Sequence, residues 1–287
     1  QIRIRKIPFH NFLKIYNDNK LIQSFAHNIT NPFKSLPDFL IVGAQKAGTT
    51  SCYLYLREHP QIQMYCPKEV QFFSFNYHKG KNWYTSHAPL SSVIKQNTLL
   101  GEASPYYLLH PHTPRRIHEL IPSVKLIVLL RNPTTRAISH YYHNCRMTRN
   151  KETLPIMEAF MAEEERVEKE WQKMIDDENY CSSIYQYCSY KRRGLYVEQL
   201  QRYYQYFDKE QILLINSKDF FSNTEDTLKK ILSFLGIDPN FKFSSLKAKN
   251  VGEAKKEVPK SVYSYLDYFF LPHNQKLYKY TQMNFGW

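Results

Sequence analysis

The sequence predicts an α/β fold in which a central parallel sheet is flanked by helices on both faces. Three apolar stretches of strand length carry this prediction, at Phe39–Val42, Val124–Leu130 and Gln211–Ile215. Segments with helical spacing lie between them, and strands that alternate with helices form parallel sheets covered on both sides. A chain of 287 residues, 43% of them hydrophobic, is long enough for one large domain, which we place at residues 36–287.

The other elements follow from local signals along the chain. Residues 1–35 are basic, show no clear period and contain Pro8 and Pro32, so we expect an N-terminal arm packed on the domain. The further expected elements, in chain order, are a helix over Thr49–Glu58, strand-like stretches at Glu69–Phe73 and Thr98–Glu102, a helix opened by Pro133 and an acidic helix over residues 156–178.

Two stretches of unusual composition are expected to be structural. The acidic helix carries Glu163, Glu164, Glu165 and Glu168, and charge runs of this kind normally form a solvated face. Residues 185–206 mix tyrosines with basic residues, which is also typical of a nucleic-acid platform. The aromatic positions there have helical spacing, so we expect most of those rings to pack in the core.

The charge balance favours an anionic ligand. The formal net charge is +13 and the sequence pI is about 9.3, which does not distinguish a nucleotide from nucleic acid, an acidic glycan, a membrane surface or simple solubility. The sequence contains no run of about 18 apolar residues, so we expect no membrane span. Gln1–Lys6 lacks the apolar core of a signal peptide.

The cysteines point to a reducing compartment. Cys52, Cys66, Cys145, Cys181 and Cys188 are an odd number without a C-x-x-C pair, which argues against a zinc site and a disulfide framework. A pair between Cys181 and Cys188 is left open. We expect a cytoplasmic, bacterial-like protein, with the Golgi lumen as the alternative if an N-terminal anchor has been removed.

A glycine-framed loop follows the first strand. Gly43 and Gly48 have the G-x-x-x-x-G spacing of a nucleotide P-loop, and a helix that starts there would direct backbone N–H groups and its positive dipole end at an anion. The P-loop lysine follows the second glycine, but Thr49 stands there and Lys46 lies inside the loop. The loop therefore predicts phosphate binding other than ordinary ATP chemistry; the alternative is a strand-to-helix turn with an incidental lysine.

A second candidate for phosphate binding follows the second strong strand. Arg131 stands at the carboxyl end of that strand, where open α/β sheets form their ligand crevice. Pro133 would open the next helix and place Ser139 two turns along it, with Arg136 nearby. A structural ion pair of Arg131 is the alternative. Two such devices at one sheet edge predict a nucleotide with two separated anionic groups, or a nucleotide with a phosphorylated partner.

Motifs spread over most of the chain resemble a known family. They are Gly43–Thr50, Lys68–Phe73, Gly101–Leu108, Leu130–Ser139, Arg193–Tyr196, Phe234–Gly236 and Asn284–Trp287. In this order they resemble the sulfotransferases that depend on 3′-phosphoadenylyl sulfate (PAPS), in the branch of bacterial sulfotransferase domains and heparan sulfate enzymes. The resemblance runs from Leu36 to Trp287 and implies a P-loop-type three-layer fold.

The resemblance implies PAPS as donor, adenosine 3′,5′-bisphosphate (PAP) as product and no metal. Lys46 would stabilise charge on the leaving 5′-phosphate, which is the kind of preorganised electrostatic help that contributes most to catalysis. Arg131 and Ser139 would bind the 3′-phosphate. The further donor contacts that it implies are Ala47, Gly48, Thr49, Thr50 and Arg193, and, in a late loop that matches poorly, Lys255 and Lys256.

The resemblance also implies the acceptor side. Glu69 would be the general base, because an acceptor hydroxyl has a high pKa and must lose its proton as sulfur is attacked. Without the resemblance, a surface ion pair between Glu69 and Lys68 is the simpler interpretation. The residues expected near the acceptor are Glu102, with a structural role as its alternative, Ser104, Tyr106 and Trp83, the last in a flap over Phe75–Trp83.

The chain departs from the heparan sulfate branch at three points. Gln71 and Ala103 replace a histidine and a lysine that handle an acidic sugar there, and the cysteine pair of the late loop is missing. We therefore predict an O-sulfotransferase that acts on a hydroxyl of a carbohydrate or small molecule, with no nucleic-acid partner. One alternative is a P-loop nucleotide kinase, although such an enzyme needs a lysine after its second glycine and this chain has Thr49 there. The other is a non-catalytic basic module that binds acidic glycan or nucleic acid.

Overall fold

The computed structural model describes residues 35–89, 97–149, 151–246 and 257–287. The expected N-terminal arm lies almost wholly outside the described residues, as do Lys255 and Lys256. The elements are β1 (Phe39–Gly43), α3 (Thr49–Leu56), β2 (Ile62–Met64), α4 (Phe72–Phe75), η2 (Tyr77–Lys79), α5 (Gly80–Thr85), β3 (Leu99–Ala103), α6 (Thr113–Leu120), β4 (Lys125–Leu130), α7 (Pro133–Cys145), α8 (Ile156–Met161), α9 (Glu163–Asp176), α10 (Ser183–Cys188), η4 (Arg192–Gly194), α11 (Tyr196–Tyr203), η5 (Lys209–Gln211), β5 (Ile212–Asn216), α12 (Ser217–Ser222), α13 (Thr224–Leu235) and α14 (Lys260–Thr281).

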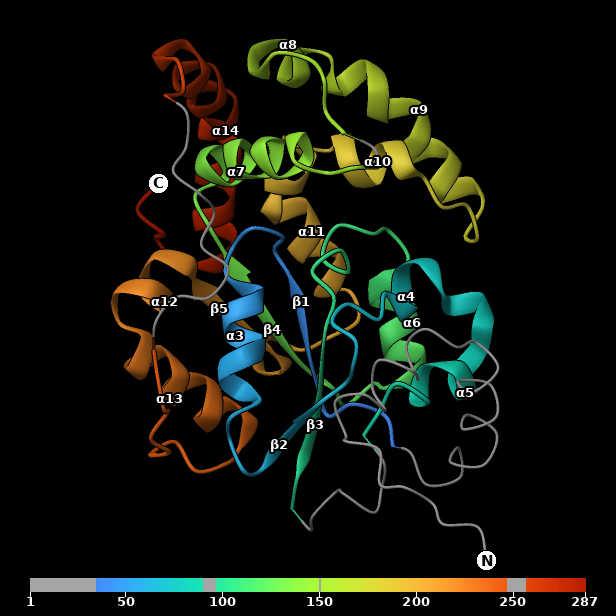
Figure 1. Cartoon of the computed structure of the whole chain (residues 1–287), viewed down its shortest axis with the longest axis vertical. Helices are drawn as coiled ribbons and strands as arrows, with labels where there is room; N and C mark the ends of the chain where they lie inside the picture. The colour runs from blue at the N-terminus through green and yellow to red at the C-terminus, as the bar shows by residue number, and fades with distance from the viewer. Residues whose placement is uncertain (1–34, 90–96, 150, 247–256) are drawn as a thin grey trace, which may run out of the picture.

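The five strands found in the described residues form one parallel sheet in the order β2-β3-β1-β4-β5 (Figure 1). Phe39 of β1 pairs with Gly101 of β3 and with Lys125 of β4, and Leu126 pairs with Ile212 of β5. The predicted α/β class with a parallel sheet is confirmed. The central strands β1 and β4 are apolar along their length because both of their faces are covered.

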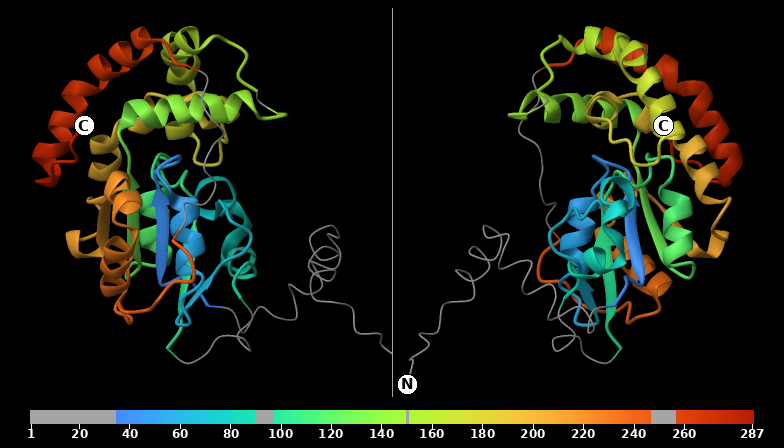
Figure 2. Two further views of the ribbon diagram at one scale, coloured as in Figure 1. Left: turned by 60° about the vertical axis from the view of Figure 1, so that its left-hand side comes forward. Right: turned by 90° about the vertical axis from the view of Figure 1, so that its right-hand side faces the viewer.

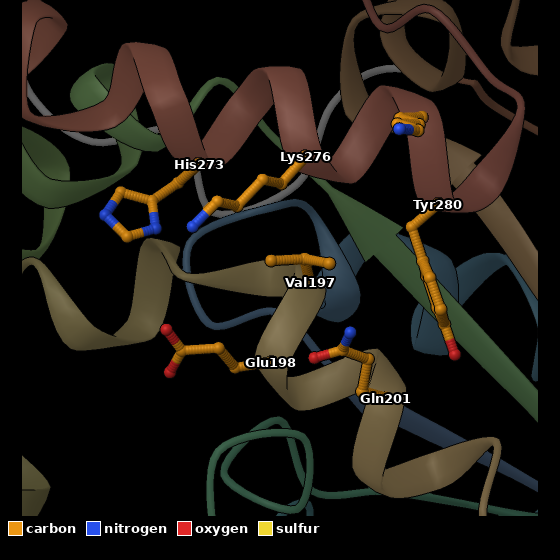
Figure 3. Close-up of a pocket in the computed structure, with 7 residues that line it drawn as sticks. Val197, Glu198, Gln201, His273, Lys276 and Tyr280 are labelled. Atoms are coloured by element: carbon orange, nitrogen blue, oxygen red, sulfur yellow. The ribbon is translucent and has the colours of Figure 1, made fainter.

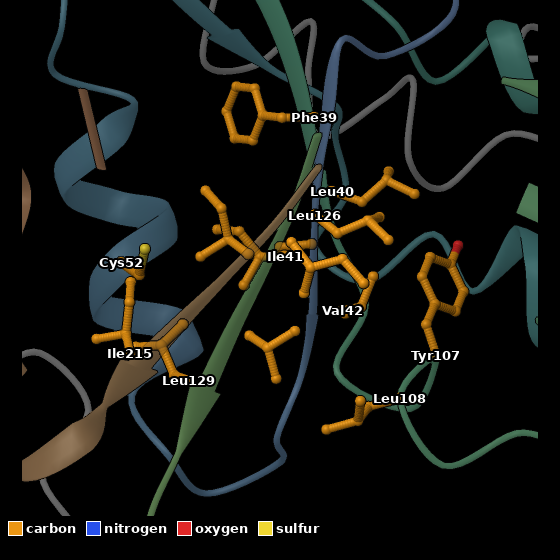
Figure 4. Packing of buried hydrophobic residues seen from close by; sticks show 14 of the residues in the cluster. Phe39, Leu40, Ile41, Val42, Cys52, Tyr107, Leu108, Leu126, Leu129 and Ile215 are labelled. Carbon is orange, nitrogen blue, oxygen red and sulfur yellow. The ribbon is translucent and has the colours of Figure 1, made fainter. Parts of the chain in front are cut away.

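Helices cover the sheet in layers. Figure 2 shows α3 and α6 on opposite faces of the sheet. In Figure 4, side chains of β1 pack with neighbours from β4, with Cys52 of α3 and with Ile215 of β5. A further helical layer, α7 to α10, lies over the edge at which the strands end (Figure 1). The sheet therefore presents its carboxyl ends to a covering layer, and the space between the two is where a ligand site is expected.

Two local predictions are wrong and one strand was missed. Glu69–Phe73 does not form a strand: Gln71 has a left-handed backbone with φ 57°, and the short buried helix α4 begins at Phe72. The edge strand β2 was not predicted. The expected helix over residues 156–178 is divided at Ala162 into α8 and α9, with α9 ending at Asp176.

The acidic helix also differs from its predicted solvated face. Glu164, Glu165 and Glu168 are exposed, but Glu163 is only 1% exposed. Its partners in α9 on the buried face are Val167, Glu170 and Met174, which recur at helical spacing. A buried carboxylate needs hydrogen-bond partners, and those of Glu163 lie in the loop that leads to η4.

The long helix α14 closes the covering layer. It packs against α7 and α11 with Val262, Leu266 and Phe270 buried. Core packing of the tyrosine-rich stretch is confirmed for Tyr196 and Tyr203 of α11. Within the described ranges, no helix is long and apolar enough to cross a membrane. Cys181 and Cys188 do not pair; both are free thiols.

Candidate active site

The loop between β1 and α3 is shaped by its two glycines. A Cβ atom on Gly43 would lie 2.6 Å from the Cβ atom of Leu108, so no larger residue fits there. Gly48 has φ +103°, and a Cβ atom on it would lie 2.8 Å from the ring of Phe221. Helix α3 begins at Thr49 without a side-chain cap among the described residues. Its first N–H groups therefore have no helical acceptor and point into the loop, as an anion site requires.

Arg131 joins the end of β4 to this loop. Its Nη1 donates to the carbonyl oxygen of Lys46 at 3.0 Å, and its Nε donates to Thr135 Oγ1 at 3.1 Å. Lys46 itself has a left-handed backbone with φ 71° and is half-buried. Two of the five guanidinium donors are thus used to hold the protein, which leaves the others for a ligand. The structure places the two predicted phosphate-binding devices side by side.

Helix α7 continues from Arg131 as predicted. Pro133 occupies its first turn, and Asn132 Oδ1 accepts from the N–H group of Thr135 at 2.9 Å. Ser139 lies on α7 and is half-buried. Further along, burial lowers the pKa of His143, and the positive charges of Lys46 and Arg193 lower it further. The charges of the glycine loop and of Arg193 thus both act on the imidazole of α7.

Arg193 is buried in η4 and is held by protein groups. Its Nε donates to Ser189 Oγ at 3.1 Å, its Nη2 donates to the carbonyl oxygen of Gln186, and its guanidinium lies 4.8 Å from the centroid of the Tyr106 ring. Burial lowers the pKa of Arg193, whereas the charge of Glu69 acts in the opposite direction. The structure therefore encloses Arg193 in the covering layer, where protein groups hold its guanidinium.

Glu163 supports the turn that carries Arg193. Its carboxylate accepts from the backbone N–H groups of Lys191 at 2.5 Å and of Arg192 at 2.9 Å. Burial raises the pKa of Glu163 to about 7, while these two hydrogen bonds oppose the rise. Sequence reasoning missed this residue, although its spacing with Val167 and Met174 marks the buried face of α9.

The predicted base lies at the surface end of a short turn. The side chain of Glu69 is 33% exposed, with Lys68 Nζ 3.5 Å from Oε1 and Gln71 Nε2 2.5 Å from Oε2. A carboxylate that remains accessible is suited to take a proton from an incoming hydroxyl. The ion pair between Glu69 and Lys68, which is the simpler interpretation of this residue, is present in the structure, and Glu69 is nevertheless accessible.

Glu102 and Ser104 lie behind Glu69 and are buried. Glu102 is 1% exposed; it accepts from Ser104 Oγ at 2.5 Å and from the hydroxyl of Tyr84 at 3.3 Å. Burial raises the pKa of Glu102 to about 7, and the charge of Glu69 contributes to the rise. The buried Tyr106 stacks on Phe75 with centroids 4.8 Å apart. None of these three predicted acceptor residues presents its side chain to solvent.

Trp83 belongs to α5 and is half-buried. Its ring stacks toward Phe72, with centroids 6.3 Å apart, and Lys79 Nζ lies 4.4 Å from the ring centroid. The predicted flap thus consists of the last residue of α4, η2 and the start of α5, and Trp83 packs it against the core.

A separate hollow lies between α11 and α14 (Figure 3). It has a volume of about 510 Å³ and is lined by polar side chains such as Glu198, His273 and Lys276. It contains none of the predicted site residues. Within the part of the chain that the structure describes, no cluster of three or more His, Cys, Asp or Glu side chains is arranged to hold a metal.

Comparison with known proteins decides the family. A family model described as the sulfotransferase domain matches residues 36–276. This chain belongs to the sulfotransferase family. As a member it is a transferase, and the resemblance found in the motifs is confirmed together with the α/β fold.

Individual relatives agree with this assignment. A solved structure of a sulfotransferase from Alicyclobacillus acidocaldarius is 29% identical with a TM-score of 0.70, and the match covers 85% of this chain and 95% of that one. Heparan sulfate glucosamine 3-O-sulfotransferase 6 of Mus musculus is 29% identical over 88% of this chain and 74% of its own length. Membrane-associated sulfotransferase kil1 of Dictyostelium discoideum is 27% identical over 88% of this chain, which spans 66% of that protein.

Proposed function

We propose that this sulfotransferase transfers a sulfuryl group from PAPS to a hydroxyl group of a carbohydrate or small molecule, and that residues 36–287 form its single domain. The observation that carries the proposal is the hydrogen bond from Arg131 to the carbonyl oxygen of Lys46. It joins two cationic devices at one sheet edge, which suits a nucleotide with phosphate groups at both its 5′ and 3′ positions. An ATP site would need neither the second device nor a lysine inside the loop.

The donor end is assigned to the strand-end residues. The N–H groups from Ala47 to Thr50 bind the 5′-phosphosulfate, and Arg131 with Ser139 binds the 3′-phosphate. Lys46 donates to the oxygen that bridges phosphorus and sulfur while the bond between this oxygen and sulfur breaks. Positive charge at this oxygen stabilises the transition state more than the ground state, because negative charge develops there only during transfer.

The acceptor end is assigned to Glu69. Its carboxylate takes the hydroxyl proton while the acceptor oxygen forms a bond to sulfur and the bond from sulfur to the 5′-phosphate breaks, which leaves PAP and a sulfate ester. Glycan hydroxyls are the first acceptors to test, because the mouse relative is named for heparan sulfate glucosamine. Gln71 and Ala103 stand where that branch carries a histidine and a lysine, so we do not assign heparan sulfate itself to this chain.

Calorimetric affinities for PAP and for ATP with Mg²⁺ distinguish a PAPS-dependent enzyme from a P-loop nucleotide kinase. We expect PAP to bind much more tightly than ATP with Mg²⁺, and equal or reversed affinities would reject PAPS as donor. Lys46→Ala and Glu69→Gln should each abolish PAP release from PAPS, while Glu69→Gln still binds PAP. Matched controls are Lys229→Ala and Glu225→Gln, which break an exposed ion pair of 3.1 Å on α13. Full turnover by Glu69→Gln would remove Glu69 as the base.

A further inference from the structure

Gln71 contacts the predicted base through its side chain. Its Nε2 atom donates to Glu69 Oε2 at 2.5 Å, and its own Oε1 accepts from Ser74 Oγ at 2.8 Å. The amide is therefore held at both ends, with its donor group directed at one carboxylate oxygen. A hydrogen bond to an ionised carboxylate is among the stronger side-chain hydrogen bonds in proteins.

The backbone of Gln71 is anchored separately to β3. Its N–H group donates to Ser104 Oγ at 3.0 Å, and Ser104 Oγ donates to Glu102 Oε1 at 2.5 Å. Ser104 is fully buried and Glu102 nearly so, which fixes this end of the network in the core. The left-handed backbone of Gln71 turns its amide side chain toward Glu69 while its N–H group faces inward.

The burial of Glu102 and Ser104 bears on what they do. Neither residue can reach an acceptor in this arrangement, because their side-chain atoms lie behind Gln71 and are shielded from solvent. Simple packing would explain a buried pair, but not an amide that extends from it to an accessible carboxylate. Gln71 thus links the core at Glu102 to the surface at Glu69, with its backbone N–H group bonded inward to Ser104 and its side-chain amide bonded outward to Glu69.

We propose that Gln71 is a positioning residue for Glu69, anchored by Ser104 and Glu102. It holds Oε2, so that Oε1, whose contact with Lys68 Nζ is longer at 3.5 Å, is the oxygen that takes the acceptor proton. The inference rests on the proposed function, because it gives Glu69 the role of base. A neutral amide fits this task, since it orients the carboxylate without supplying a charge. Loss of the amide frees the carboxylate to rotate, and small misplacements of a catalytic group reduce turnover steeply.

Kinetics of Gln71→Leu test the proposal. PAP release from PAPS is followed with N-acetylheparosan as acceptor, and with water as acceptor where N-acetylheparosan does not react. We expect kcat to fall by about tenfold to a hundredfold, with the Kd for PAP unchanged. Gln172→Leu is the matched control, because Gln172 Nε2 also donates to a carboxylate, Asp176 Oδ1, at 2.7 Å on α9. If kcat is unchanged in Gln71→Leu while Glu69→Gln is inactive, the inference about Gln71 is wrong and the proposed function still stands.

Three further measurements exclude a merely structural role. If Gln71 acts through Glu69, any residual turnover of Glu69→Gln is not lowered further in the double variant Glu69→Gln/Gln71→Leu, and an additional full loss overturns the proposal. Gln71→His keeps an N–H donor at similar reach and should restore most of the turnover. A crystal structure of Gln71→Leu with PAP should show Glu69 displaced or in several conformers; an unmoved Glu69 would contradict the inference. If Glu69→Gln itself is active, the proposed function fails instead.

Discussion

Glu102 makes the stability of the folded chain depend on pH. Its carboxyl group is buried, and this burial raises the pKa of Glu102 from 4.5 to about 7. The folded state therefore binds this proton more tightly than the unfolded chain does. The stability that the protonated carboxyl group contributes is complete below the unfolded pKa of 4.5, and it is lost as the pH rises through the folded pKa of about 7.

The size of the effect follows from the shift. A rise from 4.5 to about 7 corresponds to about 3 kcal/mol of unfolding free energy lost on the alkaline side. Glu102→Gln keeps an acceptor for Ser104 Oγ, 2.5 Å away in the native protein, but removes the titration. We subtract the free energy of unfolding of the native protein from that of the variant. We expect this difference to be about 3 kcal/mol larger near pH 8 than near pH 4, so the variant is relatively more stable at pH 8.

Urea unfolding at the two pH values, followed by circular dichroism, measures this difference. Glu163 titrates in the same range because its pKa is also raised to about 7, but it is present in both proteins and cancels. Glu225→Gln on the exposed face of α13 is the control and should show no such pH dependence. If Glu102→Gln and the native protein differ by the same amount at both pH values, Glu102 is ionised in the folded state at neutral pH and the argument from burial is wrong.

Three other changes have expected outcomes. Arg131→Ala should weaken PAP binding by about tenfold to a hundredfold but leave ADP, which lacks a 3′-phosphate, less affected; equal losses in calorimetry would argue against a 3′-phosphate contact. Gly48→Ala should lower the free energy of unfolding by roughly 1–2 kcal/mol, because φ is +103° and Phe221 crowds the new Cβ atom. Glu163→Ala should lower it near pH 6 by about 2 kcal/mol or more, since two buried N–H groups lose their acceptor. Urea midpoints check both stability predictions, and unchanged midpoints would contradict them.

The strands were predictable where burial is two-sided. Predicted and observed bounds of β1, β4 and β5 agree within about one residue, because strands covered on both faces must be continuously apolar. The edge strand β2 is only Ile62–Met64, too short to show a period. Gln71 shows the opposite failure: apolar neighbours gave a strand pattern, but its left-handed backbone and the burial of Phe72 and Phe73 produce a helical turn.

The site was predictable in part for a related reason. Lys46 and Arg131 both follow apolar strands, and parallel strands bring such residues to one edge. Glu163 is different, because it acts on backbone N–H groups 28 and 29 residues away, which have no signature in the sequence. The same holds for Gln71, whose N–H group meets Ser104 at a separation of 33 residues. Groups that act on the backbone become visible only in three dimensions.

Arg131 also limits which substitutions the site tolerates. Its guanidinium spans from Thr135 Oγ1 to the carbonyl oxygen of Lys46 with two differently directed donors. A lysine at this position would keep the charge, but its single ammonium group lacks the planar fork needed to brace two neighbours and still meet a phosphate. The net charge of +13 thus measures only the general attraction to anions. The Arg131 side chain supplies positive charge and also connects Thr135 with the loop at Lys46. A substitution of Arg131 by lysine is therefore not conservative, although it preserves the charge.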